Sequence, residues 1–166
     1  MKKEDKRWLV LSAAALVLAL CIFAGSFILF FNRSKNSSGL VPAQITARII
    51  SEMNYSDLVE VSPTQLSKHY DIPDGVIADS SLYMSKTSDS AAELACFQLT
   101  DSSKYDQLQS AISNHINSKA AGFKTLNPTQ YNALKNAEIT RAEKYVLVSV
   151  GSNSAADAKL FHEIVK

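Results

Sequence analysis

The chain of 166 residues has few cysteines and glycines, the residues that form disulfides and phosphate-binding loops. It contains two cysteines, five glycines and four prolines. Without a glycine-rich loop, a phosphate cradle for a nucleotide has no support. The two cysteines, Cys21 and Cys96, cannot form an intrachain disulfide if Cys21 lies in a bilayer. No serine stands in a Gly-x-Ser-x-Gly turn, although distant residues can still converge into a triad.

Metal-ligand spacings are missing too. His69, His115 and His162 fall on three different predicted helices, and none has a second ligand at a spacing such as His-x-x-x-His. Asp71 and Asp74 lie close in sequence, but Asp residues beside Pro and Gly are typical of a turn. We therefore predict no catalytic, cofactor-binding or metal-binding residue.

Cysteine and tyrosine offer two weaker candidates. Cys96 has no base or cation beside it in sequence, which favours a packed small residue over a reactive thiol. Tyrosine is common at interfaces, so the six tyrosines could form a binding surface. Most of them, however, fall at core-facing or strand positions: Tyr55, Tyr70, Tyr83, Tyr105, Tyr131 and Tyr145.

What the chain does have is one long apolar run, Trp8–Phe31, without a charge or a proline. As a helix it would measure about 36 Å, against about 30 Å for the hydrocarbon core of a bilayer. In lipid the backbone must satisfy its own hydrogen bonds, so the run would be helical. We predict a single transmembrane anchor over residues 8–31.

Three alternatives fit this run less well. A signal peptide has a shorter apolar stretch followed by small residues, whereas this run continues with bulky residues after Ser26. The run up to Cys21 resembles a lipobox, but Leu20 stands where a small residue is normal, so Cys21 is interpreted as an apolar filler. A pilin-type helix would follow a glycine cleavage point and carry an early acidic residue, and neither is present.

Basic residues indicate the orientation of the anchor. Four of them lie within residues 1–7, and two, Arg33 and Lys35, follow the run. This excess predicts a cytoplasmic N-terminus at residues 1–7, a polar tether at 32–41 and an extracytoplasmic domain at 42–166. The predicted location is therefore the cell membrane, crossed once.

The charge beyond the anchor is nearly balanced. Setting aside the four basic and two acidic residues of the first seven leaves 13 Lys and Arg against 14 Asp and Glu. This balance gives no electrostatic reason to expect nucleic acid as a partner. An extracytoplasmic domain without disulfides is typical of a bacterial envelope.

Residue patterns predict an α+β domain. Apolar spacing and capping residues indicate helices at 42–53, 62–70, 102–123 and 127–134, and another after Ser154. Alternating runs indicate strands at 80–86, 93–100, 137–142 and 145–150. We expect an antiparallel four-stranded sheet with helices largely on one face, built from two strand-strand-helix units.

The run from Ser62 to the C-terminus resembles a family of unknown function from Gram-positive, mainly clostridial, bacteria. The resemblance lies in VSPTQLSKHYDIP, ELACFQLTD and GFKTLNPTQYNALKNAEITRAEKYVLVSV, including the spacing of Tyr131 and Leu134. It implies a lipoprotein-like or singly anchored extracytoplasmic protein. It implies no activity for any residue.

The functional prediction is a noncatalytic binding module of the bacterial envelope. Its partners would be the bilayer, through residues 8–31, and an envelope protein or small ligand. One alternative is an envelope hydrolase whose site is assembled from dispersed residues. Another is assembly through small residues of the anchor at 13–15 and 24–26.

Overall fold

The computed structural model describes residues 39–166, and Leu40–Lys166 form one compact unit. The predicted basic N-terminus (1–7), the anchor (8–31) and most of the tether (32–41) lie outside the described residues. Within residues 39–166, no helix combines the length and the apolar character needed to cross a membrane.

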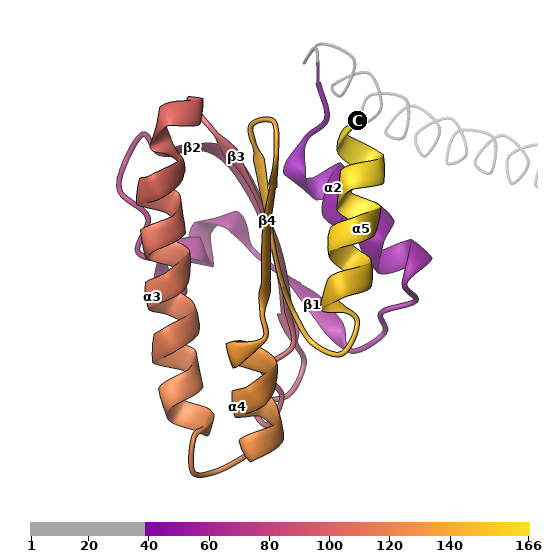
Figure 1. The fold of residues 1–166 in the computed structure, drawn as a ribbon, viewed down its shortest axis with the longest axis vertical. Coiled ribbons are helices and arrows are strands. Elements are labelled where there is room, and N and C mark those ends of the chain that lie inside the picture. Colours follow the sequence, from indigo (N-terminus) through magenta and orange to yellow (C-terminus); the bar gives the residue numbers. More distant parts are fainter. Residues whose placement is uncertain (1–38) are drawn as a thin grey trace, which may run out of the picture. The chain divides into compact units, whose positions relative to one another are not determined.

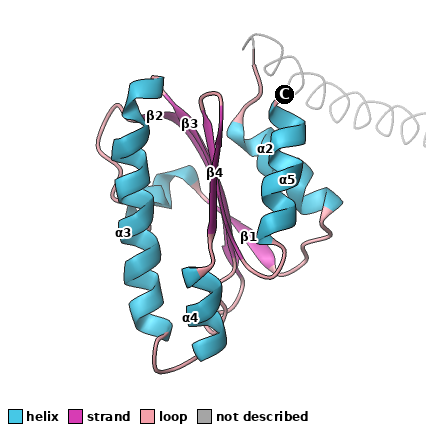
Figure 2. Cartoon of the chain, viewed as in Figure 1, coloured by secondary structure: helices cyan, strands magenta, loops and turns pink. Residues whose placement is uncertain are grey.

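A five-stranded antiparallel sheet forms the middle layer (Figures 1 and 2). Its order is β1-β2-β3-β5-β4. The strands are β1 (Leu58–Val61), β2 (Ile77–Ser85), β3 (Glu93–Leu99), β4 (Glu138–Ala142) and β5 (Tyr145–Val150). The prediction of four strands was wrong, because β1 lies where a link was expected. Its sequence, LVEV, does not alternate apolar and polar residues, so only its pairing with β2 defines it.

Helices cover both faces of the sheet, which corrects the prediction of one covered face (Figure 1). One face carries α3 (Tyr105–Phe123) and α4 (Pro128–Lys135), and the other carries α2 (Pro42–Glu52) and α5 (Ser154–Val165). The reason lies in the central strand β3. Phe97 packs into the core with α3, while Leu94 points into the core with α2 and α5. A strand that is apolar on both sides needs cover on both sides.

The two strand-strand-helix units are present, but they are not symmetric copies. They are β2-β3-α3 and β4-β5-α5, and their inner strands β3 and β5 are antiparallel neighbours. A twofold rotation relating those strands would place both helices on the same face. Instead α3 and α5 lie on opposite faces, so the likeness reflects the order of elements only.

The segment before β2 departs from prediction. The expected helix at 62–70 is a 3₁₀ helix, η1 (Pro63–Lys68), without a side-chain cap. The Ser62 hydroxyl instead pairs with the Thr64 hydroxyl at 3.0 Å. Two residues after η1 lies Tyr70, whose side chain is buried. A second short 3₁₀ helix, η2 (Ser102–Lys104), leads into α3.

Other local signals are confirmed. The Asn127 side chain accepts a hydrogen bond from the Gln130 backbone N–H and caps α4. Asn54 follows α2 with a φ of 55°. The apolar stripe of α3 is buried at Leu108, Ile112 and Ile116, as its spacing predicts. In α5, Ala156 is exposed and Asp157 is buried, so this helix turns Asp157 toward the sheet.

Candidate functional site

A buried carboxylate, Glu93, is the centre of the most polar part of the core. It is the first residue of β3 and is only 1% exposed. It shares a sheet face with Ala95 and Phe97, so its side chain lies beneath α3. A charged residue at this depth needs partners for both of its oxygen atoms.

Three side chains supply those partners. The Tyr70 hydroxyl donates a hydrogen bond to Oε1 of Glu93. Nε2 of His115 and Nζ of Lys119 contact Oε2 at 3.0 and 2.6 Å. His115 and Lys119 are four residues apart on α3, so they project from adjacent turns of one face. Both carboxylate oxygens are therefore occupied from within the protein.

A second set of contacts fixes these partners. Nδ1 of His115 lies 2.7 Å from the backbone carbonyl oxygen of His69, and Nζ of Lys119 donates to the carbonyl of Ala91 at 3.0 Å. The ring of Tyr70 stacks on His115 with centroids 4.0 Å apart. Both ring nitrogens of His115 therefore have an oxygen partner, one on the backbone and one on Glu93.

The electrostatics follow from these contacts. Burial alone would raise the pKa of Glu93, but the hydrogen bonds and positive charges of His115 and Lys119 outweigh it and hold the pKa at about 2. Burial and the neighbouring carboxylate raise the pKa of Tyr70 well above its ordinary value. Glu93 therefore stays ionised and Tyr70 stays neutral near neutral pH. Neither group has the pKa near 7 that suits a general acid or base.

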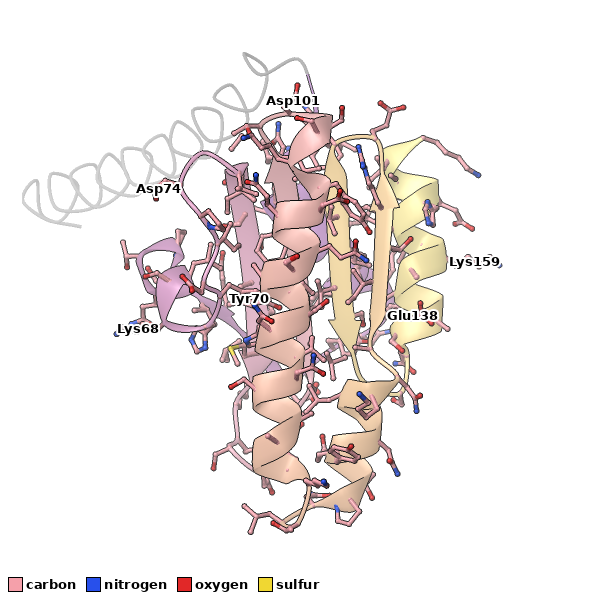
Figure 3. The ribbon with its side chains drawn as sticks, turned by 60° about the vertical axis from the view of Figure 1, so that its left-hand side comes forward. Lys68, Tyr70, Asp74, Asp101, Glu138 and Lys159 are labelled. Atoms are coloured by element: carbon pink, nitrogen blue, oxygen red, sulfur yellow. The ribbon has the colours of Figure 1, made fainter. Side chains whose placement is uncertain are left out.

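This cluster joins four segments of the chain. They are the residues directly after η1, the link before β3, the first residue of β3 and the second half of α3. In Figure 3, Tyr70 lies against α3, while Lys68 of the same segment points outward. The arrangement holds the segment after η1 and the helix α3 against the sheet.

A smaller polar cluster lies on the opposite face of the sheet. Asp157 of α5 is fully buried, and its Oδ2 accepts hydrogen bonds from Tyr55 at 2.8 Å and Ser149 at 2.6 Å. Its Oδ1 has no hydrogen-bond partner among the described residues. Burial raises the pKa of Asp157, although the two hydrogen bonds oppose that shift. The cluster ties the segment after α2 to α5 and β5.

The residues considered as candidates from the sequence are mostly dispersed. His69 and His115 meet through the carbonyl of His69, whereas His162 contacts Thr140 on the other face. Asp71 and Asp74 are exposed in the loop before β2, in accordance with their interpretation as turn residues. Among residues 39–166, no three His, Cys, Asp or Glu side chains are arranged to hold a metal ion.

The cysteine and tyrosine interpretations can also be placed. Cys96 is fully buried in β3, and burial raises the pKa of its thiol, as expected for a packed residue. The tyrosines do not gather on one surface but divide between the two cores. Tyr70, Tyr105 and Tyr131 belong to the core beneath α3, and Tyr55, Tyr83 and Tyr145 belong to the core beneath α2 and α5.

Neither Glu93 nor Lys119 was predicted as a functional residue. Glu93 was recognised only as the start of a strand, and Lys119 only as part of a helix. A usable signal was present, because His115 and Lys119 flank the buried stripe at Ile112 and Ile116 instead of lying opposite it. Two potential cations beside an apolar stripe indicate a buried acid elsewhere in the chain.

Comparison with known proteins gives a class but no activity. Residues 51–151 match the model of a family described as "Domain of unknown function (DUF4358)", and the chain belongs to this family. No curated protein and no solved structure matches the chain. The matched range contains β1 to β5, α3 and α4 together with all four residues of the Glu93 cluster.

Proposed function

We propose that this protein is a membrane-anchored extracytoplasmic binding or interaction module of a bacterial cell envelope, without catalysis of its own. The anchor is supported by the uncharged apolar run Trp8–Phe31, and its orientation by the basic residues before it. The balanced charge of the following domain supports a protein or small ligand as partner, with no part for nucleic acid.

The proposal that the protein has no catalytic activity rests on one observation: both carboxylate oxygens of Glu93 already have partners within the protein. The Glu93 side chain is inaccessible to solvent, and both oxygens are bound by Tyr70, His115 and Lys119. A substrate could reach the carboxylate only by displacing one of these partners. The cluster is therefore best explained as a structural contact that holds the segment after η1 and the helix α3 against the sheet.

The second candidate is an envelope hydrolase. One observation favours it: Glu93, His115 and Tyr70 come from three separate segments and converge at one point. For catalysis, η1 would have to move away, so that Tyr70 and the carbonyl of His69 release the other two groups. The two candidates thus differ in whether η1 opens.

Location can be tested on the full chain expressed in a Gram-positive host. We expect the protein to stay in the membrane after alkaline extraction and the domain to be cut by protease added to protoplasts. A variant lacking residues 1–31 should leave the membrane fraction. Release of the intact chain by alkali, or protection of the domain from protease, would contradict the proposal.

Catalysis can be tested with purified full chain and cell-wall peptide or glycan. We expect no turnover above that of a buffer control. Turnover that disappears in Glu93→Gln, with near-ultraviolet circular dichroism showing that the variant is still folded, would establish the hydrolase instead. If no turnover is found, in-cell cross-linking from exposed positions would identify the binding partner.

A further inference from the structure

A small pocket opens on the α3 and α4 side of the domain, away from Glu93. It has a volume of about 170 Å³ and lies where α4 leads into β4, against the middle of α3. Four of its lining residues are apolar: Ile116 and Leu134 are buried, and Ala137 and Ile139 are half-buried. Sites for small ligands are typically concave and apolar, with a few polar groups placed on them.

Three polar side chains complete the lining. They are Ser113 and Asn117 on adjacent turns of α3 and Lys135 at the end of α4. Within residues 39–166, none of the three has a hydrogen-bond or ion-pair partner. Lys135 is the one charged residue of the lining, so the pocket carries a positive charge that no acid of the lining offsets.

This combination defines the ligand chemistry. We propose that the pocket binds a carboxylate that carries a short apolar group, either as a free acid or as the C-terminus of a peptide with a small apolar last residue. Lys135 would pair with the carboxylate, and Ser113 and Asn117 would hydrogen-bond its oxygens or the adjoining amide. The apolar group would lie on Ile116 and Leu134.

The size of the pocket agrees with such a ligand. A volume of about 170 Å³ is well above what a single water needs and leaves room for a carboxylate with a short apolar group. The inference rests on the proposed binding function, because it gives that function a ligand class.

The test uses the full chain in lipid nanodiscs, with the methyl groups of Ile116, Leu134 and Ile139 observed by NMR. The probes are butyrate and N-acetyl-alanyl-alanine, each compared with its uncharged carboxamide. We expect the acids to shift these methyl signals in the millimolar range. The carboxamides should bind about tenfold more weakly, since they lack the negative charge that would pair with Lys135.

Two variants locate the binding. Lys135→Gln should weaken binding of either acid about tenfold while leaving the domain folded, because Lys135 is exposed. Ala137→Leu should fill the pocket and abolish binding. Lys159→Gln is the matched control, since Lys159 is an exposed lysine on α5, on the opposite face of the sheet (Figure 3). It should bind both acids as the unchanged protein does.

The outcomes separate the possibilities. Tighter binding of the dipeptide identifies a peptide C-terminus, and equal binding of butyrate identifies a free acid. No shift with either acid, or equal affinity in Lys135→Gln, would contradict the proposal that this pocket binds a carboxylate. If cross-linking still yields an envelope partner in that case, the proposed function stands without it. Conversion of a bound probe would overturn the noncatalytic function but not the pocket.

Discussion

At the scale of single residues, Glu93 is the feature with the largest energetic consequence. Removing a carboxylate from water is costly, and its attraction to His115 and Lys119 repays that cost only while all hydrogen bonds are made. The cluster need not make the domain more stable than an apolar replacement would. Breaking it from one side, however, leaves buried charges without a counterion.

Glu93→Gln should therefore destabilise the domain strongly. The change leaves Lys119 and His115 facing a neutral amide, and we expect a loss of about 3–5 kcal/mol in the free energy of unfolding at pH 7. Urea denaturation of the full chain, followed by circular dichroism, measures it. Glu163→Gln is the control, since Glu163 is exposed on α5. A loss as small as that of the control would mean that Glu93 is dispensable.

The same residue predicts how stability depends on pH. The pKa of Glu93 is about 2 in the fold and 4.5 in the unfolded chain, so the unfolded state takes up protons first as the pH falls. The stabilisation, about 3 kcal/mol, should be complete above pH 4.5 and lost as the pH falls toward 2. Asp157, whose pKa is raised, contributes with the opposite sign.

Urea midpoints measured between pH 7 and pH 3 test this dependence. Because Asp157 is present in both proteins, the difference between the unchanged protein and Glu93→Gln isolates the contribution of Glu93. That difference should shrink as the pH falls. A difference that stays constant with pH would show that Glu93 has the same pKa in the folded and the unfolded chain.

The hydroxyl of Tyr55 should also matter. Tyr55→Phe removes one of the two donors to the buried carboxylate of Asp157 and should lower stability by about 1–3 kcal/mol. Tyr131→Phe is the matched control, since Tyr131 is also half-buried and its hydroxyl has no partner among the described residues. Equal unfolding free energies for the two variants would argue against the Tyr55–Asp157 link.

At the scale of helices and strands, single elements could be predicted from the residue pattern within one segment. Contacts between segments could not be predicted in this way. The spacing of Leu108, Ile112 and Ile116 was enough to predict α3, and the run at 145–150 predicted an interior strand. Strand β1 was missed because its sequence, LVEV, does not alternate apolar and polar residues, and only its pairing with β2 defines it. The Glu93 cluster was missed because Tyr70, Glu93 and the pair on α3 come from segments that are distant in sequence.

Two glycines give opposite predictions at this scale. Gly122 lies in α3 with nothing near an added Cβ, so Gly122→Ala should stabilise by about 0.5–1 kcal/mol through helix propensity. Gly75 has a φ of 74° in the turn before β2, where Gly75→Ala should cost about 1–2 kcal/mol. Thermal melts of both variants test the pair. A change of the same sign in both would contradict it.

At the scale of the whole molecule, the sheet is enclosed between two helical layers, and Cys96 reports on that enclosure. It lies in the central strand beneath α2 and α5, and burial raises the pKa of its thiol. With Cys21→Ala in place, Cys96 should react with a thiol reagent only as fast as the domain unfolds globally. Labelling rates measured over a urea series test this expectation. Rapid labelling without urea would mean that the α2 and α5 layer opens by itself.

The hydrogen bond from the Tyr145 hydroxyl to the carbonyl of Leu40 has a mechanical consequence. Leu40 is where the compact unit begins, and Tyr145 belongs to β5, an interior strand of the sheet. If the preceding chain is held in a membrane, tension on it enters the domain at Leu40. The load passes directly to β5 and, through Ile45 and Ile49 of α2, to the core around Phe161. The domain would then resist pulling with its most deeply packed parts instead of yielding first at a frayed end.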